Sequence, residues 1–167
     1  ARAGIAARIY VPADAPAGKK GLMATLGSKV VECGSRGEAA TKAVSELGNG
    51  ELYIGHAWDP FYIEGMKTAA FEMFEAGAVP DAVITPVASG TLLLGLHRGF
   101  GELLCAGLIE EMPKLFGVQG DSCAPIYQDL HGGVARAAGS SLADGLRIAD
   151  PPRRGEIVEA IRSTGGD

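Results

Sequence analysis

Val83-Ile-Thr-Pro-Val-Ala-Ser-Gly-Thr-Leu-Leu-Leu-Gly95 reads as a buried strand that runs through a loop of small residues into a helix. In the loop, the small side chains of Ala88, Ser89 and Gly90 leave their backbone N–H groups uncovered, and the following helix contributes the positive end of its dipole. The hydroxyl groups of Ser89 and Thr91 add further donors. This arrangement suits an anionic phosphate, and an ordinary βα turn with a Ser or Thr N-cap has the same local pattern.

The composition favours an α/β architecture. Of the 167 residues, 47% are apolar and only 6% are aromatic, while 25 are glycine, a balance typical of helices packed closely against a parallel sheet. The net charge of −5 argues against a nucleic-acid partner, because the basic residues form no aromatic-interleaved patch. No apolar run reaches the roughly 20 residues that span a bilayer, and no secretory signal occurs.

Neither the cysteines nor the histidines form a recognisable site. Cys33, Cys105 and Cys123 are widely spaced in or beside apolar segments, which is typical of reduced thiols in an intracellular protein. No CxxC or HxxxH spacing occurs, so we expect no metal ligands. The histidines are isolated from one another: His56, His97 and His131. We therefore expect a cytoplasmic protein that binds neither a membrane nor nucleic acid.

Apolar runs rich in β-branched residues alternate with helical patterns along the chain. The expected strands are Ala7–Val11, Lys29–Cys33, Glu51–Gly55, Ala82–Pro86 and Leu115–Gln119. The expected helices are Ala17–Leu26, Gly37–Leu47, Glu64–Ala76, Thr91–Ala106, a short one followed by a loop within Asp121–Ser141, and Glu156–Ser163. This alternation predicts an open, mostly parallel sheet flanked by helices, with the apolar helix Thr91–Ala106 at its centre. Ligands bind at the carboxyl ends of such strands, where the loop before Thr91 lies.

Three further segments carry a family resemblance. They are Asp59-Pro-Phe-Tyr-Ile-Glu-Gly-Met-Lys-Thr-Ala-Ala-Phe-Glu72, Leu115-Phe-Gly-Val-Gln-Gly-Asp-Ser-Cys-Ala-Pro-Ile126 and Ser141-Leu-Ala-Asp-Gly-Leu-Arg-Ile-Ala-Asp-Pro-Pro152. In this order they resemble the threonine synthase group of fold-type II pyridoxal-phosphate enzymes. The resemblance extends from Tyr10 to Gly166, and Pro-x-x-x-Glu-Gly-x-Lys-Thr-x-x-Phe-Glu is its most specific pattern.

The resemblance implies a site for pyridoxal 5'-phosphate and a small-molecule amino-acid substrate. The cup for the cofactor phosphate would consist of Val87, Ala88, Ser89, Gly90 and Thr91. Gly120 and Asp121 would lie near the cofactor ring, at the end of the following strand. The resemblance also implies that residues 1–55 are part of a smaller α/β domain and that residues 56–167 form the core of a larger one.

Two candidate substrate-binding residues, Asp59 and Tyr62, depart from the family pattern. Tyr62 stands where many threonine synthases have an arginine that holds the substrate phosphate, and a phenol cannot make a charged, bidentate contact. Asp59 occupies a position that is often asparagine. The resemblance implies conversion of O-phosphohomoserine to threonine, and these departures leave a threonine or serine dehydratase as the nearest alternative. The cup departs too, because the family loop is usually richer in glycine or carries asparagine.

Three segments of the family are not found in this sequence. They are the Ser-x-Lys-like segment that forms the Schiff base, the asparagine-containing loop that grips the substrate carboxylate, and the late Ser or Thr at the pyridine nitrogen. The lysines present have a surface role by default: Lys19, Lys20, Lys29, Lys42, Lys67 and Lys114. We therefore expect an internal fragment without a catalytic residue of its own, inactive alone, and present as a homodimer or with a complementing fragment.

Two further classes remain open at this point. A non-catalytic α/β module could keep the phosphate cup without the lysine. A hydrolase could use the Gly120-Asp-Ser-Cys123 segment as a nucleophile with one of the histidines as base, although no GxSxG elbow flanks the serine.

Overall fold

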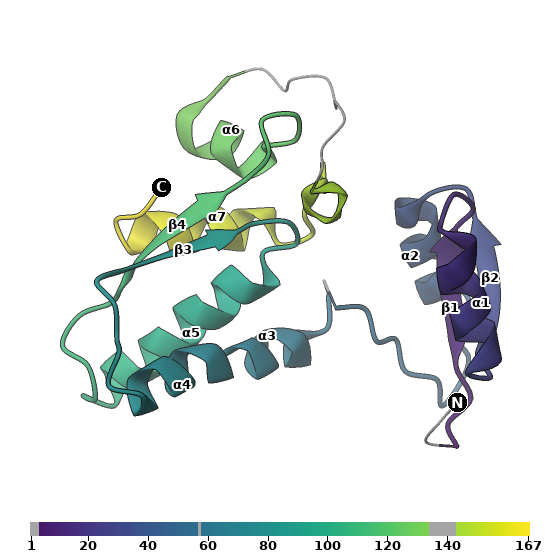
Figure 1. Ribbon diagram of the computed structural model, residues 1–167, viewed down its shortest axis with the longest axis horizontal. Coiled ribbons are helices and arrows are strands. Elements are labelled where there is room, and N and C mark those ends of the chain that lie inside the picture. Colours follow the sequence, from purple (N-terminus) through teal and green to yellow (C-terminus); the bar gives the residue numbers. More distant parts are fainter. Residues whose placement is uncertain (1–3, 57, 134–142) are drawn as a thin grey trace. The chain divides into compact units, whose positions relative to one another are not determined.

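The computed structural model describes residues 4–56, 58–133 and 143–167 of the chain (Figure 1). The chain divides into two compact units, Ala1–Gly55 and His56–Asp167. In the described ranges each unit contains one pair of parallel strands with helices packed beside it. The expected class, parallel strands flanked by helices, is therefore confirmed. No helix of the described ranges is both long and apolar enough to cross a membrane.

The first unit is built on the parallel strands β1 (Arg8–Pro12) and β2 (Lys29–Cys33). Helix α1 (Ala17–Thr25) connects them, and α2 (Arg36–Ser45) follows β2. Ser35 is the N-cap of α2, because its hydroxyl accepts a hydrogen bond from the Glu38 N–H at 3.1 Å, and the Glu38 carboxylate accepts one from the N–H of Gly34, the residue before the cap, at 2.8 Å.

The prediction of a strand at Glu51–Gly55 is wrong. The structure describes these residues without any strand, and the side chains of Leu52 and Ile54 are 80% and 63% exposed. A strand requires a neighbour for its backbone hydrogen bonds, and β1 and β2 pair only with each other in the described unit. The alternation of side chains is present, but no second strand lies beside it in the described chain.

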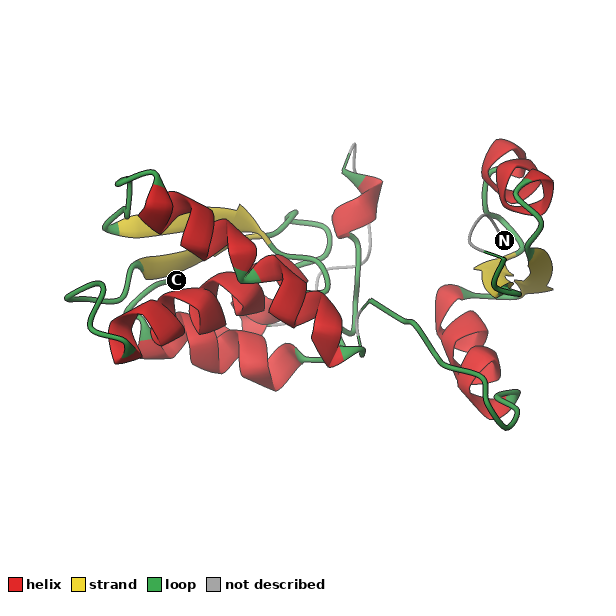
Figure 2. Cartoon of the chain, turned by 90° about the horizontal axis from the view of Figure 1, so that it is seen from below, coloured by secondary structure: helices red, strands yellow, loops and turns green. Residues whose placement is uncertain are grey.

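The second unit is built on the parallel strands β3 (Ala82–Pro86) and β4 (Lys114–Val118). Their last residues, Pro86 and Val118, are register partners, so the loops that follow both strands leave the sheet at the same edge. The helices of this unit are α3 (Pro60–Met66), α4 (Thr68–Glu75), α5 (Thr91–Cys105), α6 (Pro125–His131), the short 3-10 helix η1 (Asp144–Leu146) and α7 (Arg154–Ser163). Figure 2 shows helices of this unit lying alongside the strand pair.

Helix α5 is the centre of the second unit, as its apolar sequence predicts. It packs against α3, α4, α7 and β4. Leu93 and Phe100 of α5 are completely buried, together with Leu115 of β4 and Ile157 and Ile161 of α7. This core fixes the start of α5, and therefore the loop before it, against the sheet.

The expected helix Glu64–Ala76 is interrupted. Helix α3 ends at Met66, α4 begins at Thr68, and Lys67 lies between them. At this junction the backbone approaches α5 closely: a Cβ atom on Gly95 would lie 2.3 Å from the Met66 Cβ, and one on Gly99 would lie 2.8 Å from the Ala70 Cβ. The two glycines of α5 thus allow the α3–α4 junction to pack directly on its backbone.

Candidate functional site

The loop between β3 and α5 extends the sheet by one residue and then turns away. Val87 is completely buried, and its N–H donates to the Val118 carbonyl at 2.9 Å. The hydroxyls of Ser89 and Thr91 lie 3.0 Å apart, within hydrogen-bonding distance. Gly90 has a φ of +78°, the left-handed conformation that glycine adopts without steric cost. The sequence prediction of a strand, a small-residue loop and a helix is therefore confirmed.

The backbone N–H groups of this loop have no hydrogen-bond acceptor in the described chain. No described residue accepts a hydrogen bond from the N–H groups of Ala88, Ser89, Gly90 or Thr91. The first turn of α5 contains no acidic side chain, so no carboxylate there offsets the positive end of the dipole of this 15-residue helix. Four such N–H groups beside two hydroxyls are a donor set that fits the oxygens of a phosphate group.

The loop packs closely against helix α7. A Cβ atom on Gly90 would lie 2.2 Å from the Cδ1 atom of Ile157, which is completely buried in α7. Ala88 and Ser89 are only half-buried. The loop therefore rests on the core through Gly90 and leaves its neighbouring residues accessible to a ligand.

The loop after β4 lies at the same edge. Its backbone forms a tight turn in which the Cys123 N–H donates to the Gly120 carbonyl at 2.9 Å, and Asp121 in the turn is exposed. The register of β3 and β4 brings this turn beside the loop Val87–Thr91, so the structure gathers the predicted residues of the two loops at one sheet edge.

Gln119 joins the two loops, and the sequence pattern did not predict this role. Its side-chain N–H donates to the Val87 carbonyl at 3.2 Å, and its side-chain oxygen accepts from the N–H groups of Ile126 at 2.9 Å and Tyr127 at 3.3 Å. The only available signal was a single amide residue at the end of an apolar strand, before a small-residue turn.

Asp59 and Tyr62 lie at the start of α3. The Asp59 carboxylate caps this helix and accepts a hydrogen bond from the Phe61 N–H at 2.9 Å. The Tyr62 ring lies edge-on to the His56 ring, with centroids 6.2 Å apart. Neither side chain makes a hydrogen bond to residues 87–91 in the described parts of the chain.

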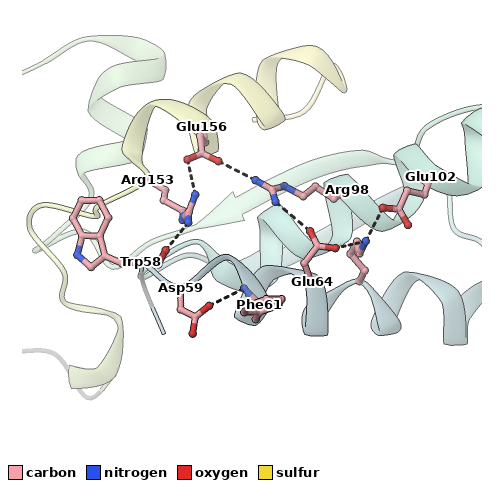
Figure 3. A network of polar contacts seen from close by, with 9 residues as sticks. Trp58, Asp59, Phe61, Glu64, Arg98, Glu102, Arg153 and Glu156 are labelled. Carbon is pink, nitrogen blue, oxygen red and sulfur yellow. Dashed lines mark hydrogen bonds and ion pairs between the residues drawn. The ribbon is translucent and has the colours of Figure 1, made fainter. Parts of the chain in front are cut away.

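Charged side chains of the Pro-x-x-x-Glu-Gly-x-Lys-Thr pattern belong to an extended polar network (Figure 3). Lys67 pairs with both Glu64 and Glu102, the second at 2.6 Å, and Arg98 donates to Glu64 at 3.3 Å. The hydrogen bond from Lys67 holds the pKa of Glu64 below its ordinary value, and the bond to Glu102 contributes most to raising the pKa of Lys67. The pattern thus ties the α3–α4 junction to α5.

The same network continues to α7. The second guanidinium nitrogen of Arg98 lies 3.3 Å from Glu156, which also pairs with Arg153 at 2.9 Å. Arg153 in turn donates to the Trp58 carbonyl at 2.9 Å, just before the start of α3. This chain of contacts links the central helix α5 to α3 and α7, two of its neighbours.

The lysines of the second unit lie away from the cup. Lys67 is held by its two carboxylates, and its side chain is only 14% exposed. Lys114 opens β4 at the end of the strand opposite to the cup. Neither Lys67 nor Lys114 is therefore placed to attach a cofactor that is bound at the cup.

The hydrolase alternative receives no support. The buried Ser122 hydroxyl has no hydrogen-bond partner in the described chain, so no base activates it. The His97 Nε2 atom instead lies 3.3 Å from the Ser163 hydroxyl, and the His131 ring lies tilted against the Tyr127 ring, with centroids 4.4 Å apart. Among the residues that the structure describes, no cluster of three or more metal-ligating side chains occurs.

Residues 1–167 match the family described as "Pyridoxal-phosphate dependent enzyme", and the chain belongs to this family. It is 31% identical over 147 residues to the threonine synthase of Methanocaldococcus jannaschii, covering 84% of this chain and 36% of that protein. It is 28% identical over 174 residues to the threonine synthase of Methanosarcina acetivorans, covering 99% of this chain and 43% of that protein. The chain thus spans less than half the length of these curated relatives.

Solved structures show the same fold. Maize serine racemase has a TM-score of 0.71 at 22% identity, covering 99% of this chain and 49% of that one. A fungal L-serine ammonia-lyase from Rhizomucor miehei has a TM-score of 0.72 at 19% identity, covering 95% of this chain and 50% of that one. Threonine deaminase isoform 2 from Solanum lycopersicum has a TM-score of 0.66 at 26% identity, covering 89% of this chain and 43% of that one. The fold-type II architecture expected from the sequence is confirmed.

Proposed function

We propose that this chain is the part of a pyridoxal-phosphate-dependent lyase that holds the phosphate of the cofactor. The observation that carries the proposal is the set of N–H groups from Ala88 to Thr91 at the start of α5, which no described residue accepts from, next to a first turn without acidic residues. In this proposal Val87 anchors the loop to the sheet, while the hydroxyls of Ser89 and Thr91 complete the donor set. When bound, the cofactor supplies an electron sink for the reacting amino acid.

The residues of the second loop would orient the rest of the cofactor. Gly120 follows the strand that is paired with β3 and forms an isolated bridge with Cys123, so it lies in the turn beside the cup. Gly120 and the neighbouring Asp121 would lie beside the cofactor ring. The absence of a side chain on Gly120 lets a flat ring approach the backbone closely.

The reaction that the relatives favour is that of threonine synthase, which converts O-phosphohomoserine to threonine. The two archaeal relatives, both threonine synthases, support this choice. Asp59 and Tyr62 would contact the amino-acid substrate. In the same proposal residues 1–55 belong to a smaller domain and residues 56–167 to a larger one, in a cytoplasmic protein that works as a homodimer or with a complementing fragment.

One observation favours a second reaction, that of a threonine or serine dehydratase. Tyr62 replaces the arginine expected for a phosphorylated substrate, and a phenol makes no bidentate, charged contact with a phosphate. The tomato threonine deaminase shares the fold at 26% identity. The two reactions are distinguished by supplying O-phosphohomoserine and threonine separately to a complete enzyme that contains this chain.

Covalent attachment of the cofactor would need a lysine other than the two of the second unit. Lys67 is held by Glu64 and Glu102, and Lys114 lies at the opposite end of its strand from the cup. We expect the chain alone to bind the cofactor reversibly and to have no lyase activity. Borohydride treatment followed by intact-mass measurement checks this, because a cofactor fixed to one of the six lysines would contradict it.

The phosphate assignment is tested by comparing pyridoxal 5'-phosphate with pyridoxal, which lacks the phosphate, in equilibrium dialysis against the chain. We expect the phosphorylated form to bind at least about tenfold more tightly, since several charge-assisted hydrogen bonds depend on it. Ser89→Asp should abolish this preference, because a carboxylate at the start of α5 repels the phosphate while remaining compatible with the helix.

Ser35→Asp is the matched control. Ser35 caps α2 in the first unit, so the same substitution adds the same charge at another helix start. The proposal predicts that this variant keeps the preference for the phosphorylated form. Equal binding of the two ligands by the unaltered chain, or equal loss in both variants, would contradict the phosphate assignment.

A further inference from the structure

Gln119 takes over a hydrogen bond that the sheet backbone would otherwise make. In a parallel pair, a residue bonds through its N–H and its carbonyl to the two residues that flank its register partner. The register of β3 and β4 makes Gln119 the partner of Val87, so the Val87 N–H should bond to Val118 and the Val87 carbonyl to the Gly120 N–H. The first bond is present at 2.9 Å, but the Val87 carbonyl accepts from the Gln119 side chain at 3.2 Å instead.

Because the Gln119 side chain replaces the Gly120 N–H as donor to the Val87 carbonyl, the Gly120 backbone takes a different path. Its N–H is not used in the ladder, because Gly120 is instead paired with Cys123 in an isolated antiparallel bridge. The chain is free to leave the sheet at Gly120 and to form the turn closed by the Cys123 N–H. The carbonyl of the completely buried Val87 nevertheless keeps a donor, which avoids the cost of an unpaired buried carbonyl.

The orientation of the Gln119 amide is fixed by its partners. Its oxygen faces two backbone N–H groups at the start of α6, those of Ile126 and Tyr127, and its nitrogen faces a carbonyl. Only the amide in this orientation provides both a donor and an acceptor at these places. A carboxylate of the same size would keep the bonds to α6 and lose the one to Val87.

We propose that Gln119 is a positioning residue for the phosphate cup: its amide fixes the loop Val87–Thr91 relative to α6 and lets the chain leave the strand ladder at Gly120, beside the cup. The inference rests on the proposed function, since the ligand of the cup is the one assigned there. Gln119 itself need not touch the ligand, because it acts through the Val87 carbonyl and through the path of the chain at Gly120.

The test uses Gln119→Glu, which cuts the link to Val87 while retaining the two bonds from α6. Gln128→Glu is the matched control, because it makes the same chemical change on α6, at a side chain outside the cup. We expect Gln119→Glu to bind pyridoxal 5'-phosphate about tenfold more weakly than Gln128→Glu, the loss that one positioned hydrogen bond supports. The thermal unfolding midpoint of Gln119→Glu should also be lower, because the buried Val87 carbonyl loses its donor.

A spectroscopic measurement without ligand separates the inference from the proposed function. In amide ¹H–¹⁵N spectra, Gln119→Glu should shift the resonances of residues 88–91 and 120, and Gln128→Glu should leave them in place. Unmoved resonances, or equal cofactor affinity in the two variants, would overturn the inference. If the unaltered chain shows no preference for the phosphorylated ligand but these resonances still shift, the proposed function fails and the positioning of the loop by Gln119 stands.

Discussion

Gly95 of α5 lies directly against Met66, the last residue of α3: a Cβ atom on Gly95 would be 2.3 Å from the Met66 Cβ and 2.9 Å from its carbonyl carbon. No side chain can occupy that space while the two backbones keep their positions. The contact explains why a helix that is otherwise rich in leucine contains a glycine near its start, where glycine weakens an isolated helix.

We predict that Gly95→Ala lowers the free energy of unfolding by about 1–3 kcal/mol, the usual cost of an overpacked core. Gly101 lies in the same helix, and a Cβ atom added there would meet nothing within 4 Å, so Gly101→Ala should instead stabilise the chain by about 0.5–1 kcal/mol through helix propensity. Urea unfolding of both variants checks the prediction, and equal effects would contradict the close approach of the helices.

The contact between Gly90 and Ile157 predicts a non-additive pair. Gly90→Ala forces a side chain into Ile157 and also strains a left-handed residue, so it should destabilise the chain by about 2–4 kcal/mol. Ile157→Ala empties part of the same space. In a double-mutant cycle, the double variant should be more stable than the sum of the single effects predicts, by at least about 0.5 kcal/mol. Strict additivity would show that the loop does not rest on Ile157.

Glu64 makes the stability of the chain depend on pH. Its pKa is lower in the folded chain than its ordinary value of 4.5, because Lys67 and then Arg98 hydrogen-bond to the carboxylate. A depressed acid stabilises the folded state above its unfolded pKa, and this contribution disappears as the pH falls through the lower folded value. Stability should therefore decrease below about pH 4.5 more steeply in the unaltered chain than in Glu64→Gln.

Glu75→Gln is the control for this prediction, since Glu75 at the end of α4 takes no part in the network. It should retain the acid-side loss of stability that Glu64→Gln reduces. Thermal unfolding followed between pH 3 and pH 6, about 1.5 units on either side of the ordinary value, makes the comparison. Identical pH profiles for the two variants would show that the network contributes nothing through Glu64.

The local sequence pattern was sufficient to predict the bounds of those strands that have a neighbouring strand to pair with. The strands Lys29–Cys33 and Ala82–Pro86 have the predicted bounds, because each is a short β-branched run with a parallel neighbour. Glu51–Gly55 has a similar composition but no neighbour in the described chain, and a sequence pattern cannot reveal that. The break at Lys67 lies beside a tertiary contact, the approach of Gly95 to Met66, which neither helix shows in its own sequence.

The candidate site could be predicted only in part, for a related reason. The cup Val87–Thr91 is one continuous segment, so its small residues and hydroxyls are visible in the sequence. The role of Gln119 depends on the register between two strands, which places its side chain opposite the Val87 carbonyl. The predicted loop within residues 134–142 lies outside the described residues.

The most direct test of the phosphate cup is a titration of the chain with pyridoxal 5'-phosphate, followed through its amide ¹H–¹⁵N resonances. The largest shifts are predicted at residues 88–91, whose N–H groups have no acceptor in the described chain, and at Gly120 in the neighbouring turn. The chain offers a second basic location for comparison, where Arg154 and Arg162 of α7 contact Asp129. Largest shifts around Arg154 and Arg162, with the resonances of residues 88–91 unmoved, would contradict the assignment of the cofactor phosphate to the start of α5.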